Sequence, residues 1–232
     1  MASDSTRRGF LRAAGVAAVG GTMASAAAAP GAAKAGREKA IRIVGISCSP
    51  RPDKTTAQGL GICLKAAKES GPNVETELIE LAGLNIPVFD PAAPGSADFE
   101  KVAAKLDDPK VAGIIVGTPV YFGNMTSLAK AFLDQCMVFR KKGLALSNKV
   151  AGVLAVGGVR SGGQEMAIQS VQAALLCQEM IVVGDGRPTA HFGATLWNQG
   201  DDVSGDEFGV ATAKNLGRRV AEVALRVSGA AG

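Results

Sequence analysis

Short runs of apolar, β-branched residues alternate along the chain with longer segments in which apolar positions recur every three or four residues. Turn residues bound the short runs, as they bound buried strands, and the longer segments have the periodicity of amphipathic helices. The predicted strands are residues 40–47, 74–81, 111–118, 150–156 and 180–183. The predicted helices are residues 56–69, 97–106, 127–142, 164–178 and 206–227.

Five strand and helix pairs in alternation predict an α/β fold, a doubly wound five-stranded parallel sheet with right-handed crossovers in a three-layer α/β/α arrangement. Such sheets bind ligands at the carboxyl ends of their strands. The loops after the first, third and fourth strands are therefore the places to expect a site. The Pro/Gly/Asp-rich stretch 85–98 is interpreted as a surface connection within the same domain.

Composition and charge narrow the classes of function. The 232 residues suit one α/β domain, and 47% hydrophobic residues with only 4% aromatics are typical of helices packed closely on a parallel sheet. The formal charge is +4, of which Arg7, Arg8 and Arg12 against Asp4 contribute +2, so nucleic-acid binding gains no support. Four cysteines without a CxxC pair and one histidine predict no structural metal.

The N-terminal segment has the features of an export signal. Residues 5–12, STRRGFLR, place paired arginines before Phe10, and a weakly apolar stretch, 13–29, follows. This resembles a twin-arginine signal, which implies export of a folded, cofactor-loaded protein by the dedicated machinery, to the periplasm or otherwise outside the cytoplasm. Residues 1–35 are thus predicted to be the signal and a flexible start, and 36–232 the domain. The alternative is a membrane anchor, but the stretch is short and rich in Ala and Gly. Cleavage after Ala28, Ala29, Ala33 or Ala35 would fit the sequence equally well.

The loop after the first predicted strand, SCSPRPDKTT at 47–56, has the groups of a phosphate site. Hydroxyls, two cations and the free N–H groups of a helix start form a cup suited to a terminal phosphate. These groups belong to Ser49, Arg51, Lys54, Thr55 and Thr56. Because the loop lacks GxGxxG and GK[ST], it disfavours a dinucleotide pyrophosphate or ATP. The alternative is an ordinary proline-containing turn in which Thr55 or Thr56 caps the helix.

The loop after the third predicted strand carries the most specific motif, GTPVYFGNMTSLAKAFLDQ at 117–135. It resembles the flavin-cradling loop of the NADPH-dependent FMN reductase and iron–sulfur flavoprotein family, and the resemblance extends over about residues 41–227. It implies a flavodoxin-like fold and FMN as cofactor. A flavin ring needs a flat apolar wall and backbone donors at its edge. The motif can supply both from Pro119, Val120, Tyr121, Phe122, Gly123 and Asn124. The alternative, that Tyr121 and Phe122 are core aromatics, is disfavoured because consecutive loop residues do not both point inward as alternating strand positions do.

The loop after the fourth predicted strand, GGVRSGGQE at 157–165, resembles the third flavin contact of the family. Its glycines, which would allow close backbone approach, are Gly157, Gly158, Gly162 and Gly163. Arg160 is a candidate for tuning the flavin potential, because a cation near the ring would stabilise a reduced anionic flavin. A solvated loop arginine is the alternative.

The chain also departs from the family pattern. Iron–sulfur members carry a compact cysteine cluster after the second strand, whereas 85–98 has no cysteine, so no iron–sulfur centre is expected. Cys48 stands where the family usually has glycine and is interpreted as a small-residue substitute. His191 could act as a base with Asp201 or Asp202, but without GxSxG a hydrolase is disfavoured, and His191 is expected to cap the C-terminal loop or border the flavin pocket. Trp197 could cover the ring.

These features predict an FMN oxidoreductase that takes up electrons in pairs and reduces a small acceptor, such as a quinone, a flavin or a metal ion. The family's electron donor is NAD(P)H. Because the signal predicts export from the cytoplasm, a protein or a membrane quinol is an alternative electron donor. One alternative is a flavodoxin-like carrier that docks to redox partners, although the near-neutral charge disfavours it. Another is a flavin-binding module without turnover. Members of the family usually form dimers or tetramers, and the resemblance therefore implies a homodimer or homotetramer.

Overall fold

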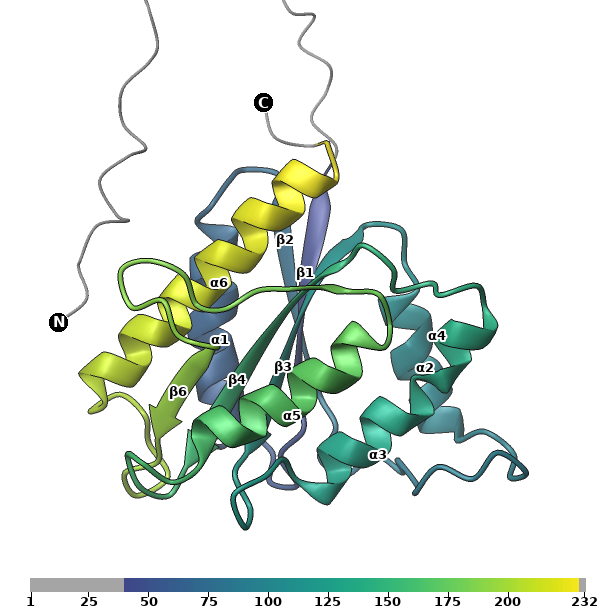
Figure 1. Ribbon diagram of the computed structural model, residues 1–232, viewed down its shortest axis with the longest axis horizontal. Coiled ribbons are helices and arrows are strands. Elements are labelled where there is room, and N and C mark those ends of the chain that lie inside the picture. Colours follow the sequence, from purple (N-terminus) through teal and green to yellow (C-terminus); the bar gives the residue numbers. More distant parts are fainter. Residues whose placement is uncertain (1–39, 230–232) are drawn as a thin grey trace, which may run out of the picture. The chain divides into compact units, whose positions relative to one another are not determined.

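The computed structural model describes residues 40–229, which fold around one parallel sheet (Figure 1). The predicted export signal lies outside these residues. The strands are β1 (Ile41–Ser47), β2 (Val74–Glu80), β3 (Val111–Pro119), β4 (Val150–Gly157), β5 (Ile181–Val182) and β6 (Ala194–Trp197). The helices are α1 (Thr55–Lys68), α2 (Ala97–Leu106), α3 (Ser127–Gln135), α4 (Met137–Lys141), α5 (Gln164–Leu176) and α6 (Glu207–Val227).

The sheet has the strand order β2-β1-β3-β4-β5, with every pair parallel, and β6 also pairs with β4. This order is that of flavodoxin-like folds. Successive strands are added on one side of β1 up to β2 and on the other side from β3 onward, so the strand order reverses between β1 and β3. The α/β class, the parallel sheet and the three layers were all predicted correctly. Between residues 40 and 229, no helix has both the length and the apolar composition needed to cross a bilayer.

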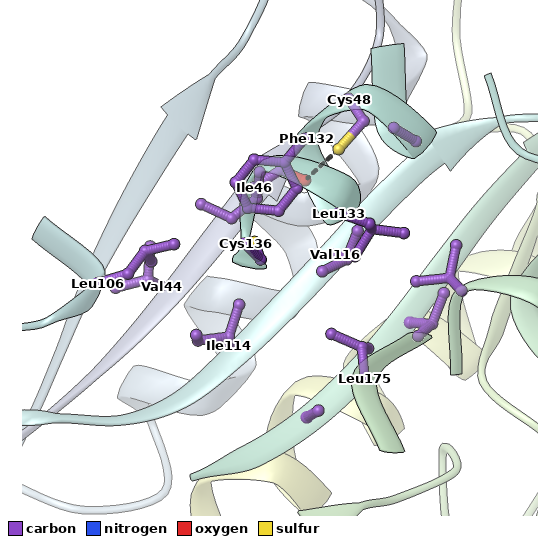
Figure 2. Close-up of a cluster of buried hydrophobic side chains, with 14 of the residues drawn as sticks. Val44, Ile46, Cys48, Leu106, Ile114, Val116, Phe132, Leu133, Cys136 and Leu175 are labelled. Atoms are coloured by element: carbon purple, nitrogen blue, oxygen red, sulfur yellow. Dashed lines mark hydrogen bonds between the residues drawn. The ribbon is translucent and has the colours of Figure 1, made fainter. Parts of the chain in front are cut away.

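Two hydrophobic cores, one on each face of the sheet, hold the layers together. Ile43 and Ile115 point into the core under α1 and α6, whereas the neighbouring Val44 and Val116 point into the core under α2, α3, α4 and α5. Figure 2 shows part of the second core, where Phe132 and Leu133 of α3 lie against strand residues. Because both faces are covered, β3 and β4 are buried almost throughout, which explains their continuous apolar runs.

Two features of the fold differ from the sequence predictions. The sheet has six strands instead of five, because β5 and β6 pair with successive parts of β4: β5 with Val150 and Ala151, and β6 with 154–157. Such short edge segments carry little periodic signal. The helix predicted at 127–142 is two helices, α3 and α4, which meet at Cys136. There the backbone closes a tighter turn, with the N–H of Phe139 donating to the carbonyl of Cys136 at 3.0 Å.

A glycine allows α1 and α6 to approach each other on their face of the sheet. A Cβ added at Gly217 of α6 would lie 1.9 Å from the carbonyl oxygen of Cys63 in α1. Gly61, on the exposed side of α1, has open space around the same position. The two glycines therefore offer a matched pair for testing this contact.

We expect Gly217→Ala to lower the free energy of unfolding by about 3 kcal/mol, because the two helix backbones must separate. Gly61→Ala should instead raise it by about 0.5–1 kcal/mol, since alanine restricts the unfolded chain and favours the helix. Urea unfolding followed by circular dichroism measures both. Equal stability of the two variants would contradict the close contact.

Candidate functional site

Three loops meet at the carboxyl edge of the sheet, after β1, β3 and β4. The register aligns these strand ends, since Ser47 pairs with Gly117, and Pro119 at the end of β3 pairs with Val156 of β4. The strand order reverses between β1 and β3, and doubly wound sheets bind their ligands at the crevice that such a reversal opens at this edge. The predicted site residues on the three loops are thus brought to one edge of the sheet.

The loop after β1 forms a tight turn that leaves the start of α1 without a side-chain cap. The hydroxyl of Ser49 accepts a bond from the backbone N–H of Arg51 at 3.1 Å and donates to its carbonyl at 3.0 Å. Lys54 is the N-cap residue and makes no side-chain capping bond. The alternative in which Thr55 or Thr56 caps this helix is therefore wrong. Both threonines lie inside the first turn of α1 and are buried.

Buried hydroxyl groups at this edge lack partners among the described residues. Ser47 Oγ and Thr56 Oγ1 are both buried without a hydrogen bond, and so is Oε1 of Gln58 in the same segment. Buried polar atoms are nearly always hydrogen-bonded, so unpartnered hydroxyls beside an uncapped helix start fit a bound anion. A terminal phosphate would accept from both the hydroxyls and the helix N–H groups. The segment therefore fits the phosphate of FMN.

The two cations of this loop are held by a carboxylate from far along the chain. Arg51 Nη1 lies 2.8 Å from Oδ1 of Asp201, and Lys54 Nζ lies 3.2 Å from Oδ2. The hydrogen bond from Arg51, followed by that from Lys54, lowers the pKa of Asp201. Gln58 also donates to the backbone carbonyl of Asp201 at 3.2 Å. The predicted phosphate-binding cations are thus paired with Asp201, a contact that the sequence did not reveal.

The loop after β3 is a two-residue turn that carries aromatic side chains at its tip. Tyr121 and Asn124 exchange two backbone hydrogen bonds, of 2.9 and 3.1 Å, around Phe122 and Gly123, which both have positive φ. The Tyr121 side chain is half exposed and that of Phe122 is fully exposed. Neither side chain belongs to the core, which agrees with the sequence argument against that alternative. The remaining predicted residue of this wall, Val120, donates its N–H to Val156 at 2.9 Å.

Two threonines that sequence reasoning missed fix this loop in place. The hydroxyl of Thr126 accepts from the N–H of Ala129 at 3.0 Å, as the cap of α3, and donates to the carbonyl of Cys48 at 2.8 Å. The N–H of Thr126 donates to Thr118 Oγ1 at 3.1 Å. Thr126 therefore ties the loop after β3 to the loop after β1. The capping pattern of threonine before a helix was the available signal.

The loop after β4 is organised around a buried glutamine. Gln164 Oε1 accepts from the N–H of Gly162 at 2.8 Å, and Nε2 donates to the carbonyl of Val159 at 2.7 Å. A Cβ at Gly157 would lie 2.4 Å from Gln164, and one at Gly163, whose φ is +93°, would lie 3.0 Å from the Cα of Gly123. These glycines serve the packing of the chain itself. Gly158, by contrast, has open space at the Cβ position.

Arg160 points toward the start of α6. Its guanidinium forms an ion pair with the buried carboxylate of Asp206 and lies 5.8 Å from the centroid of the Phe208 ring. Burial lowers the pKa of this guanidinium, which still remains charged at neutral pH. In this arrangement the negative charge of Asp206 offsets the positive charge of Arg160. A role of Arg160 in tuning the flavin potential therefore stays a prediction. Trp197 Nε1 donates to the carbonyl of Gly158 at 3.1 Å, which places the indole beside this loop.

His191 lies near loop residues but not near the aspartates first considered for it. Its Nδ1 is 3.8 Å from Oδ2 of the buried Asp185, and its ring packs edge-on against Phe208 at 5.7 Å. Asp201 is engaged by the phosphate loop, and Asp202 accepts from Ser204. A His191–Asp201 or His191–Asp202 pair is therefore wrong. Instead, His191 and Arg160 line a cleft of about 380 Å³ at the start of α5.

The cysteines of the described residues form no cluster, and three of their four thiols are buried. Cys48, Cys63 and Cys136 are buried, Cys177 is exposed, and all four are free. Burial raises the pKa of the Cys48 thiol, and Figure 2 shows its sulfur pointing toward the carbonyl of Ile46 inside the core. Within 40–229, no three His, Cys, Asp or Glu side chains gather as a metal site would require. Cys48 thus acts as a small apolar residue.

Comparison with known proteins connects these loops to a family. The family model described as NADPH-dependent FMN reductase matches residues 41–195. An iron–sulfur flavoprotein of Methanocaldococcus jannaschii is 40% identical over 192 residues, which cover 79% of this chain and 97% of the relative. An NAD(P)H dehydrogenase (quinone) of Bradyrhizobium diazoefficiens is 32% identical, over 71% of this chain and 88% of the relative.

A solved structure shares the fold at low identity. RosB with the bound intermediate 8-demethyl-8-formylriboflavin-5'-phosphate superposes with a TM-score of 0.64 at 17% identity, covering 82% of this chain and 81% of RosB. The family match spans β1 to the start of β6, which includes all three loops of the site. The chain belongs to the NADPH-dependent FMN reductase family of flavin-dependent oxidoreductases.

Proposed function

We propose that this chain is an exported FMN-dependent reductase that passes electrons from NAD(P)H or another donor to a small acceptor such as a quinone, a flavin or a metal ion. The observation that carries the proposal is the meeting, at one sheet edge, of unpartnered hydroxyls and an uncapped helix with the exposed Tyr121 and Phe122. The first two suit a phosphate, and the aromatic turn offers an apolar wall for a ring.

The residues would divide the work of holding FMN between its two ends. Ser47 and Thr56, with the first N–H groups of α1, would bind the phosphate, and the turn around Phe122 together with Gly158 would face the ring. Bound FMN would supply the electron chemistry, because it accepts electrons from one partner and gives them to another. The chain would bind and orient it, with Cys48, Cys63 and Cys136 buried away from the reaction.

The names of the relatives favour one electron acceptor, and they also raise the question of an iron–sulfur centre. A relative named as a quinone-reducing NAD(P)H dehydrogenase favours a quinone among the possible acceptors. Other relatives are named iron–sulfur flavoproteins, yet residues 85–98 hold no cysteine and three of the four cysteines are buried. We therefore propose that FMN is the sole redox group. From the assembly usual in the family, we also propose that the working form is a homodimer or homotetramer.

Anaerobic mixing of the FMN-loaded protein with NADH or NADPH tests the reaction. We expect either nucleotide to remove the visible absorbance of the oxidised flavin, and a quinone added afterwards to restore it. Free FMN at the same concentration is the control. If a chemical reductant bleaches the flavin but neither nucleotide does, NAD(P)H is not the donor and the other donor of the proposal is required. Reduction in two resolved one-electron steps would favour a carrier that docks to redox proteins. A chain that takes up no FMN would overturn the proposal.

The pairing of Arg51 and Lys54 with Asp201 yields a prediction about phosphate binding. A phosphate must compete with the Asp201 carboxylate for both cations, so Asp201→Asn should tighten FMN binding by about two- to fivefold. Arg51→Ala should weaken it by about tenfold through the loss of a charge-assisted bond. Fluorescence titration of the apoprotein measures both affinities.

Riboflavin, which lacks the phosphate, separates this effect from a general loss of the site. Neither variant should change riboflavin binding, and Lys68→Gln, at the far end of α1, should leave FMN binding unchanged. Weaker binding of both flavins to the Asp201 variant would show that Asp201 instead holds the loop in its folded shape.

Export by the twin-arginine route predicts a fractionation result. Replacement of the paired arginines by lysine, Arg7→Lys with Arg8→Lys, should leave an unprocessed, FMN-loaded precursor in the cytoplasm, because the pair is what the machinery reads. Arg12→Lys is the control and should be exported. Immunoblots of cell fractions give the result, and an unchanged distribution of the double variant would contradict this route.

A further inference from the structure

A basic pocket lies away from the flavin loops, between α6 (yellow in Figure 1) and the segment that separates β5 from β6. It has a volume of about 650 Å³ and is lined by four arginines, Arg187, Arg218, Arg219 and Arg226. The three on α6, at spacings of one, seven and eight residues, all line the same hollow. We call this hollow the arginine pocket.

A polar network fixes the wall of the arginine pocket. The buried carboxylate of Asp185 accepts from the hydroxyl of Thr189 and from the N–H of His191. Asn215 Nδ2 donates to Thr189 Oγ1 at 2.9 Å, and Asn215 Oδ1 accepts from Arg218 Nη1 at 3.3 Å. These bonds anchor the segment to α6, so the shape of the pocket is built into the fold.

The charges in the arginine pocket are not balanced by the chain. Among the described arginines, only Arg187, Arg219 and Arg226 have a side chain without a hydrogen bond, ion pair or ring contact, and all three line this pocket. Two carboxylates also line it. Asp185 already accepts two bonds, and Glu222 brings a single negative charge, so the two carboxylates can offset at most two of the four positive charges. At least two positive charges would remain unmatched.

We propose that the arginine pocket binds an anion that carries two or more phosphate groups. Guanidinium groups bind phosphate oxygens through paired N–H donors, and several of them around one hollow suit several phosphates better than a single one. The α6 wall of the pocket is separate from the FMN site: the N-cap residue Asp206 pairs with Arg160 of the loop after β4, and residues 215–226 follow about 13 to 30 Å further along the helix. A bound polyanion would also remove the repulsion among the arginines.

The proposal is tested on the full chain saturated with FMN, so that the flavin phosphate site is filled. Calorimetry with inorganic tripolyphosphate should show binding, and orthophosphate should bind at least tenfold more weakly. ATP is measured in parallel: tighter binding than tripolyphosphate would identify a nucleotide as the source of the phosphates, and weaker binding an inorganic polyphosphate. Absence of tripolyphosphate binding, or equal binding of orthophosphate, would overturn the proposal.

Variants then place the binding in this pocket. Arg187→Gln with Arg219→Gln should weaken tripolyphosphate binding by about tenfold or more. Lys214→Gln with Lys68→Gln removes the same charge from exposed positions outside the pocket and should change binding by less than about twofold. The unfolding temperature without anion should not fall in the arginine variant, since both side chains lack partners. Equal losses of affinity in the two double variants would overturn the assignment.

Discussion

The parallel register of β1, β3 and β4 is the constraint on which the candidate site depends. Because Ser47 pairs with Gly117 and Pro119 with Val156, three loops leave the sheet at the same edge. Both faces of these strands are covered, so the loops start from a rigid base. Thr126 adds the bond from the loop after β3 to the carbonyl of Cys48, which joins two of the three loops directly.

The segment that follows the family match completes this arrangement. Asp206 caps α6 by accepting from Gly209, accepts from the N–H of Trp197 and pairs with Arg160, so one buried carboxylate joins α6, β6 and the loop after β4. Asp201 does the corresponding work for the loop after β1. Both carboxylates lie beyond residue 195, where the family match ends. The part of the chain outside that match therefore orders two of the three loops.

Two groups of positive charge are handled differently by this fold. Arg51, Lys54 and Arg160 are each paired with an aspartate from the C-terminal segment, so two carboxylates offset two of these three positive charges. In the arginine pocket the positive charges are not paired in this way, because the Asp185 carboxylate accepts a hydrogen bond from the backbone N–H of His191 instead of pairing with an arginine. An anion at the flavin edge must compete with carboxylates, whereas one at α6 meets guanidinium groups that are already free.

The sequence by itself determined the alternation of strands and helices, the strand ends that carry the loops and the aromatic turn at Tyr121 and Phe122. These follow from periodicity and turn chemistry, which act over a few residues. Only the tertiary structure decided that β6 extends the edge of the sheet, and that the predicted helix breaks at Cys136. It also decided that Arg51 pairs with a carboxylate 150 residues away, and that the side chains of three arginines lining the arginine pocket stay unpaired. Ion pairs depend on which distant segments pack together, and local sequence carries no record of that packing.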